Sequence, residues 1–483
     1  MRQPSASSSI EFTRRDLLSL ALKGGGAVLL GRPSSAMLAD TVPDVKLRIA
    51  SIELEIAPGL RITTTAYNGG VPLSPLRLQE GTPVHIEITN ETNRDEYVHW
   101  HGFLIPAAVD GAEEERSLAV PANQTLSYVL TPQPAGARYV HSHAMAGHNL
   151  ARGTYSGQFG FVYVEPKDDA GCYDREVFLA THEWEPYLTN DELEEQSHEP
   201  IEQQARDQQA TAAEMSQDHW EVAYKVGSIN GKALGHGEPI RVKEGERVLF
   251  HVLNASATEN VRLSLPGHHF RVMALDGNPI PKQALVDVLE LGVGERIDAL
   301  VEMRTPGVWI FGSNDDVLRE QGLGVVVEYA GKLGAPMWKD PTGQGWDYTL
   351  FSEGTLPVKE DVAMPMVIDE VTRNVNGYER WLINGSAYSD MEEPTVLRRG
   401  VRYRFAFRNK SDDAHPLHFH RSRFELVSVN GRVATGIRKD VFVVRPFGTA
   451  EVDLVPTEAG LMLFHCHNQF HMDSGFKRVF NVV

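Results

Sequence analysis

Cysteine is scarce in this chain. Cys172 and Cys466 are the only two among 483 residues, and no Cys-x-x-Cys pair occurs. So little cysteine argues against a disulfide-rich scaffold and against structural zinc, which usually takes more thiolates. We interpret Cys172, in the run DAGCYDREVFL, as an unpaired small apolar residue. Cys466 is therefore expected to be a free thiol.

Positive charge and long apolar runs are scarce as well. The chain has 46 Lys and Arg against 65 Asp and Glu, which gives a net charge of −19. An acidic surface repels polyanions, so we expect no nucleic-acid partner. The apolar run LSLALKGGGAVLLG near the start is interrupted by Lys and Gly. It is too short and too weakly apolar to be a stable membrane anchor.

The beginning of the chain is typical of an export leader. The run TRRDLL at 13 to 18 precedes the short apolar run, and small residues follow, ending near Ala36 or Ala39. This order predicts a twin-arginine signal peptide over residues 1 to 39. We therefore expect a periplasmic or secreted protein, with the twin-arginine export machinery as a partner. The alternative is a disordered tail with an accidental arginine pair.

One unit of sequence recurs three times. Each copy carries an Asn-Gly pair and then a Pro, a Gly and an Asn at spacings of six and nine residues. The marker residues are Asn68, Pro75, Gly81 and Asn90 in the first copy, Asn230, Pro239, Gly245 and Asn254 in the second, and Asn384, Pro394, Gly400 and Asn409 in the third. Apolar and polar residues alternate before each final Asn, as in VHIEITN, which is the period of a β-strand. The sequence therefore predicts an all-β protein with three tandem β-sandwich domains.

The spacing of the copies also predicts the domain limits. We expect the first domain over residues 40 to 168, the second over 169 to 335 and the third over 379 to 483. A stretch rich in Gly, Pro and Asp at 336 to 378 is interpreted as a connector. A run rich in Glu, Gln and Ala at 190 to 218 breaks the β pattern and predicts a helical or mobile insertion. That insertion is either a surface excursion or a lid over a substrate site.

Histidines gather in four His-x-His pairs, which occur only in the first and third copies. Two pairs stand nine residues after the repeated Asn, and two stand five residues after a glycine. The second copy has Leu-Ser-Leu and Gly-Ser-Asn at these places. The paired histidines are His99, His101, His141 and His143 in the first copy, and His418, His420, His465 and His467 in the third. These eight imidazoles can meet only if the first and third domains face one another.

Cys466 stands between two of these histidines. Side chains alternate along a strand, so His465 and His467 are expected on one face and the thiolate on the other. One tripeptide could thus serve two metal sites back to back. His415 and His471 lie in the same motifs and would complete a three-ligand group with Cys466. One thiolate with two imidazoles, beside an eight-imidazole cluster, favours copper over zinc or iron.

The motifs that hold these residues resemble those of the three-domain multicopper oxidases, the laccase and cuprous-oxidase family. They are HWHG at 99 to 102, HSH at 141 to 143, HPLHFH at 415 to 420 and HCHNQFHMDSGF at 465 to 476. The resemblance covers the chain after the leader and implies three cupredoxin-like Greek-key domains. It also implies four copper ions: one type 1, one type 2 and a type 3 pair.

The resemblance assigns a metal ion to each ligand. It gives His415, Cys466 and His471 to the type 1 copper, and His99 and His418 to the type 2 copper. The type 3 pair would be held by His101, His141, His143, His420, His465 and His467. A reducing substrate would pass four electrons, one at a time, through Cys466 to His465 or His467. Dioxygen would be the partner that is reduced to water.

Two further positions follow from the resemblance. Phe476 occupies the family's axial position, ten residues after Cys466. Because a phenyl ring cannot coordinate, it implies a three-coordinate type 1 copper of high potential. Asp110, eleven residues after His99, stands where similar enzymes carry a proton-relay carboxylate, although an exposed loop position is the alternative. Some bacterial relatives have another acid where this chain has Met472.

The reducing substrate is predicted from absences. The 12 methionines form no methionine-rich repeat of the kind that collects Cu(I). This absence, together with Phe476, favours phenols or aromatic amines and a laccase-like activity. Asp412 and Asp413 could instead hold a cation. The alternatives are a periplasmic cuprous or metal-ion oxidase and, less favoured, a non-enzymatic copper-binding or envelope protein. His148 is interpreted as a neighbour of the cluster and not as a ligand.

Overall fold

The computed structural model describes residues 42–147, 149–167, 171, 173–185, 222, 224–371, 380–389 and 393–483. The predicted signal peptide, the insertion at 190 to 218, Cys172 and His148 lie outside the described residues. From Pro43 to Val483 the chain forms one compact unit. Within the described part, no helix combines the length and the apolar character needed to cross a membrane.

The first domain consists of two four-stranded sheets. One sheet has the order β2 (Leu60–Tyr67), β1 (Val45–Ala57), β4 (Val84–Asn90) and β6 (Thr125–Leu130). The other has the order β3 (Leu73–Gln79), β8 (Phe159–Glu165), β7 (Gly136–Ser142) and β5 (Val98–His101). The predicted all-β fold is confirmed for this part of the chain.

The second domain pairs a seven-stranded sheet with a five-stranded one. The larger sheet contains β10 (Val226–Ile229), β9 (Arg175–Trp184), β12 (Arg247–Asn254), β18 (Arg296–Glu302), β14 (Phe270–Leu275) and β15 (Asn278–Pro279), with β16 (Leu285–Val286) beside β14. The smaller sheet contains β11 (Ile240–Val242), β20 (Gly324–Tyr329), β19 (Val308–Ser313), β13 (Val261–Ser264) and β17 (Leu289–Leu291).

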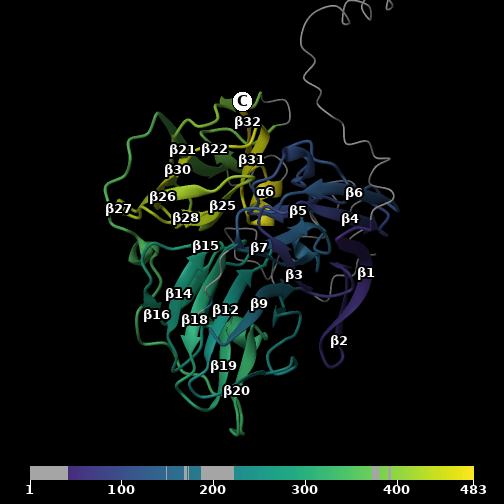
Figure 1. Cartoon of the computed structure of the whole chain (residues 1–483), viewed down its shortest axis with the longest axis vertical. Helices are drawn as coiled ribbons and strands as arrows, with labels where there is room; N and C mark the ends of the chain where they lie inside the picture. The colour runs from purple at the N-terminus through teal and green to yellow at the C-terminus, as the bar shows by residue number, and fades with distance from the viewer. Residues whose placement is uncertain are drawn as a thin grey trace, which may run out of the picture. The chain divides into compact units, whose positions relative to one another are not determined.

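The third domain repeats this topology strand for strand. Its larger sheet contains β22 (Arg380–Ile383), β21 (Val362–Val371), β24 (Tyr403–Asn409), β30 (Thr449–Leu454), β26 (Phe424–Val429) and β27 (Arg432–Val433), with β28 (Arg438–Lys439) beside β26. Its smaller sheet contains β23 (Thr395–Leu397), β32 (Lys477–Val482), β31 (Gly460–Cys466), β25 (His415–Phe419) and β29 (Val441–Val444). In Figure 1 the yellow and green strands of this domain lie beside the blue strands of the first. The equivalent strand orders of the second and third domains agree with the sequence unit that these domains share.

The repeated asparagines have the same structural task in each domain. Asn90, Asn254 and Asn409 each end a strand and donate two hydrogen bonds from the side-chain amide to main-chain carbonyl groups. One acceptor lies in the loop that follows, and the other lies 30 to 37 residues further along the chain. The Asn-Gly pairs form turns in which both residues have positive φ, as at Asn68 (53°) and Gly69 (75°). Tight hairpin turns favour these two residue types because they tolerate that conformation.

The predicted connector at 336 to 378 is wrong in its second half. Val362–Val371 forms β21, which pairs in parallel with β24 and antiparallel with β22. The prediction failed because this strand contains Pro365 and two methionines, and only part of it is buried, so its alternation is weak. The limits predicted for the three domains otherwise remain predictions.

Helices are short in the described residues. They are η1 (Ala107–Val109), η2 (Gly153–Tyr155), α5 (Asp316–Glu320), η4 (Tyr348–Phe351) and α6 (Gln469–Asp473). The side chain of Asn468 caps α6 by accepting the N–H groups of Phe470 and His471. This cap sets the orientation of the helix that carries His471, directly after β31.

A buried imidazole joins strands of the first and second domains. His251 on β12 is hydrogen-bonded to Asp298 (2.7 Å) and lies 3.7 Å from Glu176, which also forms an ion pair with Arg77 on β3. Its ring stacks on Phe178 with the centroids 4.4 Å apart. Burial opposes protonation, but the two carboxylates outweigh burial and raise the pKa of His251 to about 9.

We predict that His251→Gln loses stability in a pH-dependent way. The folded pKa exceeds the unfolded value, so the proton stabilises the fold fully below about pH 6.5, and this contribution disappears as the pH rises through about 9. The loss in free energy of unfolding should be about 3 kcal/mol at pH 6, and it should shrink as the pH rises from about 6.5 through about 9. Urea unfolding of both proteins across this range measures it. The exposed His269, bonded to Asp287, provides the control His269→Gln; an equal loss at every pH in His251→Gln would contradict the prediction.

Candidate metal centres

Strand register brings the histidine pairs together within each domain. In the first domain β5 pairs with β7 so that His99 lies opposite His141. In the third domain β25 pairs with β31 so that His418 lies opposite His465. Each domain therefore presents four imidazoles from two neighbouring strands.

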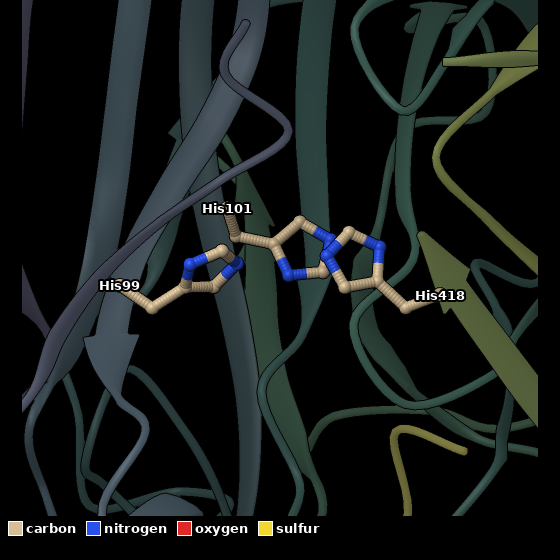
Figure 2. A group of neighbouring side chains, drawn as sticks. All are labelled: His99, His101 and His418. Carbon is tan, nitrogen blue, oxygen red and sulfur yellow. The ribbon is translucent and has the colours of Figure 1, made fainter. Parts of the chain in front are cut away.

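The two sets of four imidazoles meet between the first and third domains. The His101 ring stacks on His418 with centroids 3.8 Å apart, and the His99 ring stacks on His420 at 4.0 Å. Figure 2 shows His99, His101 and His418 pointing toward one another. None of the eight residues is more than 4% exposed. The eight histidines predicted to form one cluster do lie together.

Three groups of nitrogen atoms within this cluster are spaced like metal ligands. Each group places its donor atoms within 4.8 Å of one another. The groups are His99, His101 and His418; His101, His141 and His467; and His143, His420 and His465. The last two groups together contain the six histidines assigned above to the type 3 pair. The first contains the two assigned to the type 2 ion.

The hydrogen bonds of these rings leave lone pairs directed at the cluster. The Nδ1 atoms of His99, His141 and His418 lie 2.7–2.9 Å from main-chain carbonyl oxygens, which can only accept, so Nδ1 carries the proton. The Nε2 atoms of the same rings are buried and have no protein partner. A buried, unpaired lone pair is costly unless a cation binds it. The residues therefore fit a metal cluster.

Burial keeps the cluster imidazoles neutral. Desolvation, followed by the neighbouring imidazoles, lowers the pKa well below the ordinary value of histidine. This shift holds for His101, His141, His143, His418, His420, His465 and His467. Neutral imidazole is the form that binds a metal ion.

A separate group of three donors surrounds Cys466. Its Sγ lies 3.8 Å from His415 Nδ1 and 3.6 Å from His471 Nδ1, and the two nitrogens are 3.3 Å apart. The centre of such a triangle lies about 2.1 Å from each corner, within the range of metal–imidazole and metal–thiolate bonds. Burial raises the pKa of the Cys466 thiol, so a bound cation is what would deprotonate it. These donors fit one three-ligand site.

Aromatic side chains wall this site. The Trp381 ring lies 4.6 Å from His415 and 4.3 Å from His471, measured between centroids. Phe476 lies 5.0 Å from the His415 ring and stacks on Trp381. Phe476 is therefore beside the three donors, where the sequence placed it, and offers no ligand atom. Trp381 was missed because its motif carries no metal-binding residue.

The tripeptide at 465 to 467 contacts both centres. His465 Nε2 lies 3.0 Å from His420 Nε2, and His467 Nε2 lies 3.3 Å from His101 Nδ1. Cys466 points into the three-donor site instead. The side chains of the tripeptide therefore alternate as predicted, with the two imidazoles at the eight-histidine cluster and the thiol at the three-donor site.

Asp110 is buried and not an exposed loop residue. Its Oδ2 lies 2.8 Å from His420 Nδ1 and 3.2 Å from His99 Nδ1. Behind it lies Glu115, whose pKa is raised well above the usual range by burial and by the nearby Asp110. Glu115 Oε2 also lies 3.1 Å from Arg421 Nε. Glu115 was not predicted, since it lies in the acidic run EEE at 113 to 115, where an exposed loop is the usual interpretation.

Asp473 joins the two domains beside the cluster. Its Oδ2 accepts the N–H groups of Ala146 and Gly147, which follow His143, at 3.0 and 2.8 Å. Burial raises its pKa to about 6. Met472, its neighbour on α6, is buried. Asp473 thus fixes the helix of His471 to the first domain.

A cavity of about 240 Å³ opens at the three-donor site. His471, Phe470, Asp413 and Glu259 are among the residues that line it. His471 directs Nδ1 toward Cys466, and its Nε2 lies 3.8 Å from Asp413 Oδ2. A small molecule in this cavity would contact the outer edge of a metal ligand.

Sequence comparison decides the family. Three profiles described as multicopper oxidase match residues 49–169, 189–326 and 360–483. The chain belongs to the multicopper oxidase family. It is therefore a copper-dependent oxidoreductase with dioxygen as electron acceptor, and the family resemblance seen in the motifs is confirmed.

Individual multicopper oxidases are similar over most of the chain. The multicopper oxidase MmcO of Mycobacterium tuberculosis is 25% identical over 86% of this chain and 82% of its own length. Laccase-4 of Thanatephorus cucumeris is 25% identical over 86% and 85%, and copper resistance protein A of Escherichia coli is 24% identical over 59% and 50%. The structure of Fet3p, a multicopper oxidase that functions in iron import, superposes with a TM-score of 0.76 at 16% identity over 91% of this chain and 90% of its own. This likeness confirms the fold.

We predict that Cys466→Ser separates the two centres. The variant should lose the blue absorption of a copper–thiolate bond and the oxidation of substrates. It should keep copper bound at the eight histidines, none of which contacts Sγ in the described residues. Copper per chain and the visible spectrum measure both effects. Oxidation at the parent rate would show that electrons do not pass through Cys466.

Proposed function

We propose that the chain is a four-copper, laccase-like oxidase of small reducing substrates. His415, Cys466 and His471 would hold the type 1 copper, His99 and His418 the type 2 copper, and the other six cluster histidines the type 3 pair. When bound, these ions supply one-electron redox chemistry and the four-electron reduction of dioxygen to water. The unpaired Nε2 atoms at the centre of the cluster are the observation that carries this proposal.

The chain itself would supply the path between the centres. Cys466 is joined by the main chain to His465 and His467, and His465 Nδ1 also lies 2.8 Å from the Cys466 carbonyl oxygen. All three residues are at most 4% exposed, so the path lies away from bulk solvent. Burial of the whole path supports electron transfer without side reactions.

Asp110 would hold the proton that the oxygen chemistry consumes. Its Oδ2 lies 2.8 Å from Nδ1 of His420, a cluster histidine of the third domain. Glu115, its buried neighbour, is favoured in the protonated form and would act as the next acid in line. Both carboxyl groups are shielded from bulk water.

The cavity beside His471 supports cationic aromatic amines and phenols as substrates. Its lining contains two carboxylates, Asp413 and Glu259, and one phenyl ring, Phe470. Carboxylates stabilise an ammonium group, and a phenyl ring packs against an aromatic one. The same two carboxylates favour a second candidate, a metal-ion oxidase, as the relationship to copper resistance protein A also does.

We predict that Asp413→Asn discriminates between substrates by charge. The kcat/KM for an aromatic amine carrying a positive charge should fall about tenfold. Two opposite charges about 4 Å apart stabilise one another by about 1 kcal/mol in water and by more near a protein surface, and about 1.4 kcal/mol corresponds to a factor of ten. The value for a neutral methoxyphenol should hardly change. Oxygen uptake by the copper-loaded protein measures both, with Cu(I) as a third substrate. Asp412→Asn is the matched control, since Asp412 does not line the cavity.

Two outcomes would change the substrate proposal. A kcat/KM for Cu(I) that exceeds the aromatic values by orders of magnitude would favour the metal-ion oxidase. Equal effects of Asp413→Asn on charged and neutral substrates would mean that Asp413 does not select by charge.

The site of action is proposed to be outside the cytoplasm. The run TRRDLL, followed by a short apolar run and small residues, supports twin-arginine export to the periplasm or the medium. A route that exports folded proteins suits this chain, because its metal ligands come from two domains that are far apart in the sequence and meet only after folding.

We predict that replacing the adjacent arginines Arg14 and Arg15 by lysine blocks export. Arg14→Lys with Arg15→Lys keeps the charge and removes the recognised pair. In a bacterial host with twin-arginine export, the protein should then stay in the cytoplasm, as measured by fractionation and immunoblotting. The control is Arg2→Lys. Unchanged export of the double variant would contradict this route.

A further inference from the structure

Two aspartates hold the cluster in a mirrored way. The carbonyl oxygen of Asp110 lies 2.9 Å from Nδ1 of His99 in its own domain, and its carboxylate contacts His420 of the third domain. Asp440 repeats this arrangement from the other side. Its carbonyl oxygen lies 2.7 Å from His418 Nδ1, and its Oδ1 lies 3.0 Å from His101 Nε2 of the first domain.

The neighbours of the two carboxylates differ. Asp110 lies beside another carboxyl group, that of Glu115. Asp440 instead receives a two-pronged bond from Arg296, with Nη1 to Oδ1 at 2.6 Å and Nη2 to Oδ2 at 2.7 Å. Arg138 adds a contact of 3.3 Å to Oδ2. The side chains of Asp440, Arg296 and Arg138 are at most 1% exposed.

Arg296 begins β18 of the second domain, which provides none of the cluster histidines. Further residues of that domain fix the segment around Asp440. Asp276 Oδ2 accepts the N–H groups of Asp440 and Val441, each at 3.1 Å, and Lys439 Nζ lies 2.9 Å from the same carboxylate. The main-chain direction at Asp440 is thus set by the second domain.

The glycine of the HWHG motif makes room for this pair. Gly102 has φ 81°, and a Cβ at this position would lie 2.6 Å from Asp440 Oδ2 and 2.8 Å from Arg296 Nη2. A side chain at position 102 would therefore push the Asp440 carboxylate away from His101 and Arg296. The motif and the arginine pack against each other.

We propose that Arg296 is a positioning residue for the copper ligands His101 and His418, acting through Asp440. A guanidinium that grips both carboxylate oxygens fixes the plane of Asp440, and through it the ring of His101 and the carbonyl oxygen that orients His418. The second domain thereby takes part in the trinuclear site without contributing a ligand. This inference rests on the copper assignment proposed above.

The test compares copper retention in Arg296→Lys and Arg296→Met. Both lose the two-pronged bond, and lysine keeps the charge. Loss of such a supporting contact typically weakens metal binding about 10- to 100-fold. Cluster copper should therefore leave faster in a chelator by that factor, and the type 2 electron paramagnetic resonance spectrum should change. The blue band of the type 1 copper should remain.

A matched control separates positioning from stability. Arg404 makes an equivalent two-pronged bond to Asp453, at 2.8 and 2.9 Å, and touches no histidine of either centre. Arg404→Met should lower the melting temperature without changing copper release or the type 2 spectrum. If Arg296→Met fails to fold, Arg296→Lys decides the question alone.

The outcomes that overturn the proposal are distinct from those that overturn the function. Parental copper retention and an unchanged type 2 spectrum in Arg296→Lys would show that Arg296 does not position the ligands. The readout is bound copper, so a parent protein that binds copper but oxidises nothing would contradict the proposed function and still test Arg296. A parent protein without cluster copper would overturn both.

Discussion

The contact between the first and third domains is the constraint on which the rest of this structure depends. Each domain supplies four of the eight buried imidazoles, and neither set is complete alone. Imidazoles with unpaired nitrogens are costly to bury, so the interface needs strong partners elsewhere. Asp110, Asp440 and Asp473 provide them, because each reaches from its own domain to a group in the other.

Much of the metal chemistry could be predicted from the sequence. Strand alternation alone separates Cys466 from His465 and His467, since the period of a strand is fixed by its backbone. The repeat supplied the three domains, because the marker asparagines and Asn-Gly turns have local structural causes that recur in each copy. Asp110 was predicted from its position eleven residues after His99, next to the HWHG motif. These features depend on short stretches of chain and therefore leave a local signal.

The supporting charges could not be predicted for the opposite reason. Arg296 and Asp440 are 144 residues apart in the chain, and the sequence around either residue gives no sign that the two form an ion pair. Glu115 is in an acidic run that resembles any exposed loop. The segment Val362–Val371 forms a strand because it pairs with β24, although its own alternation of apolar and polar residues is weak. In each case tertiary packing decides the environment of the residue.

The placement of the cluster ligands at both ends of the chain also orders events during biosynthesis. The first domain, with its four histidines, emerges from the ribosome long before the last two cluster ligands, His465 and His467, are made. No translation intermediate that ends before this point can assemble the cluster. The complete set of eight imidazoles can therefore form only after His467 has been made, and a product truncated before this residue would lack part of the cluster.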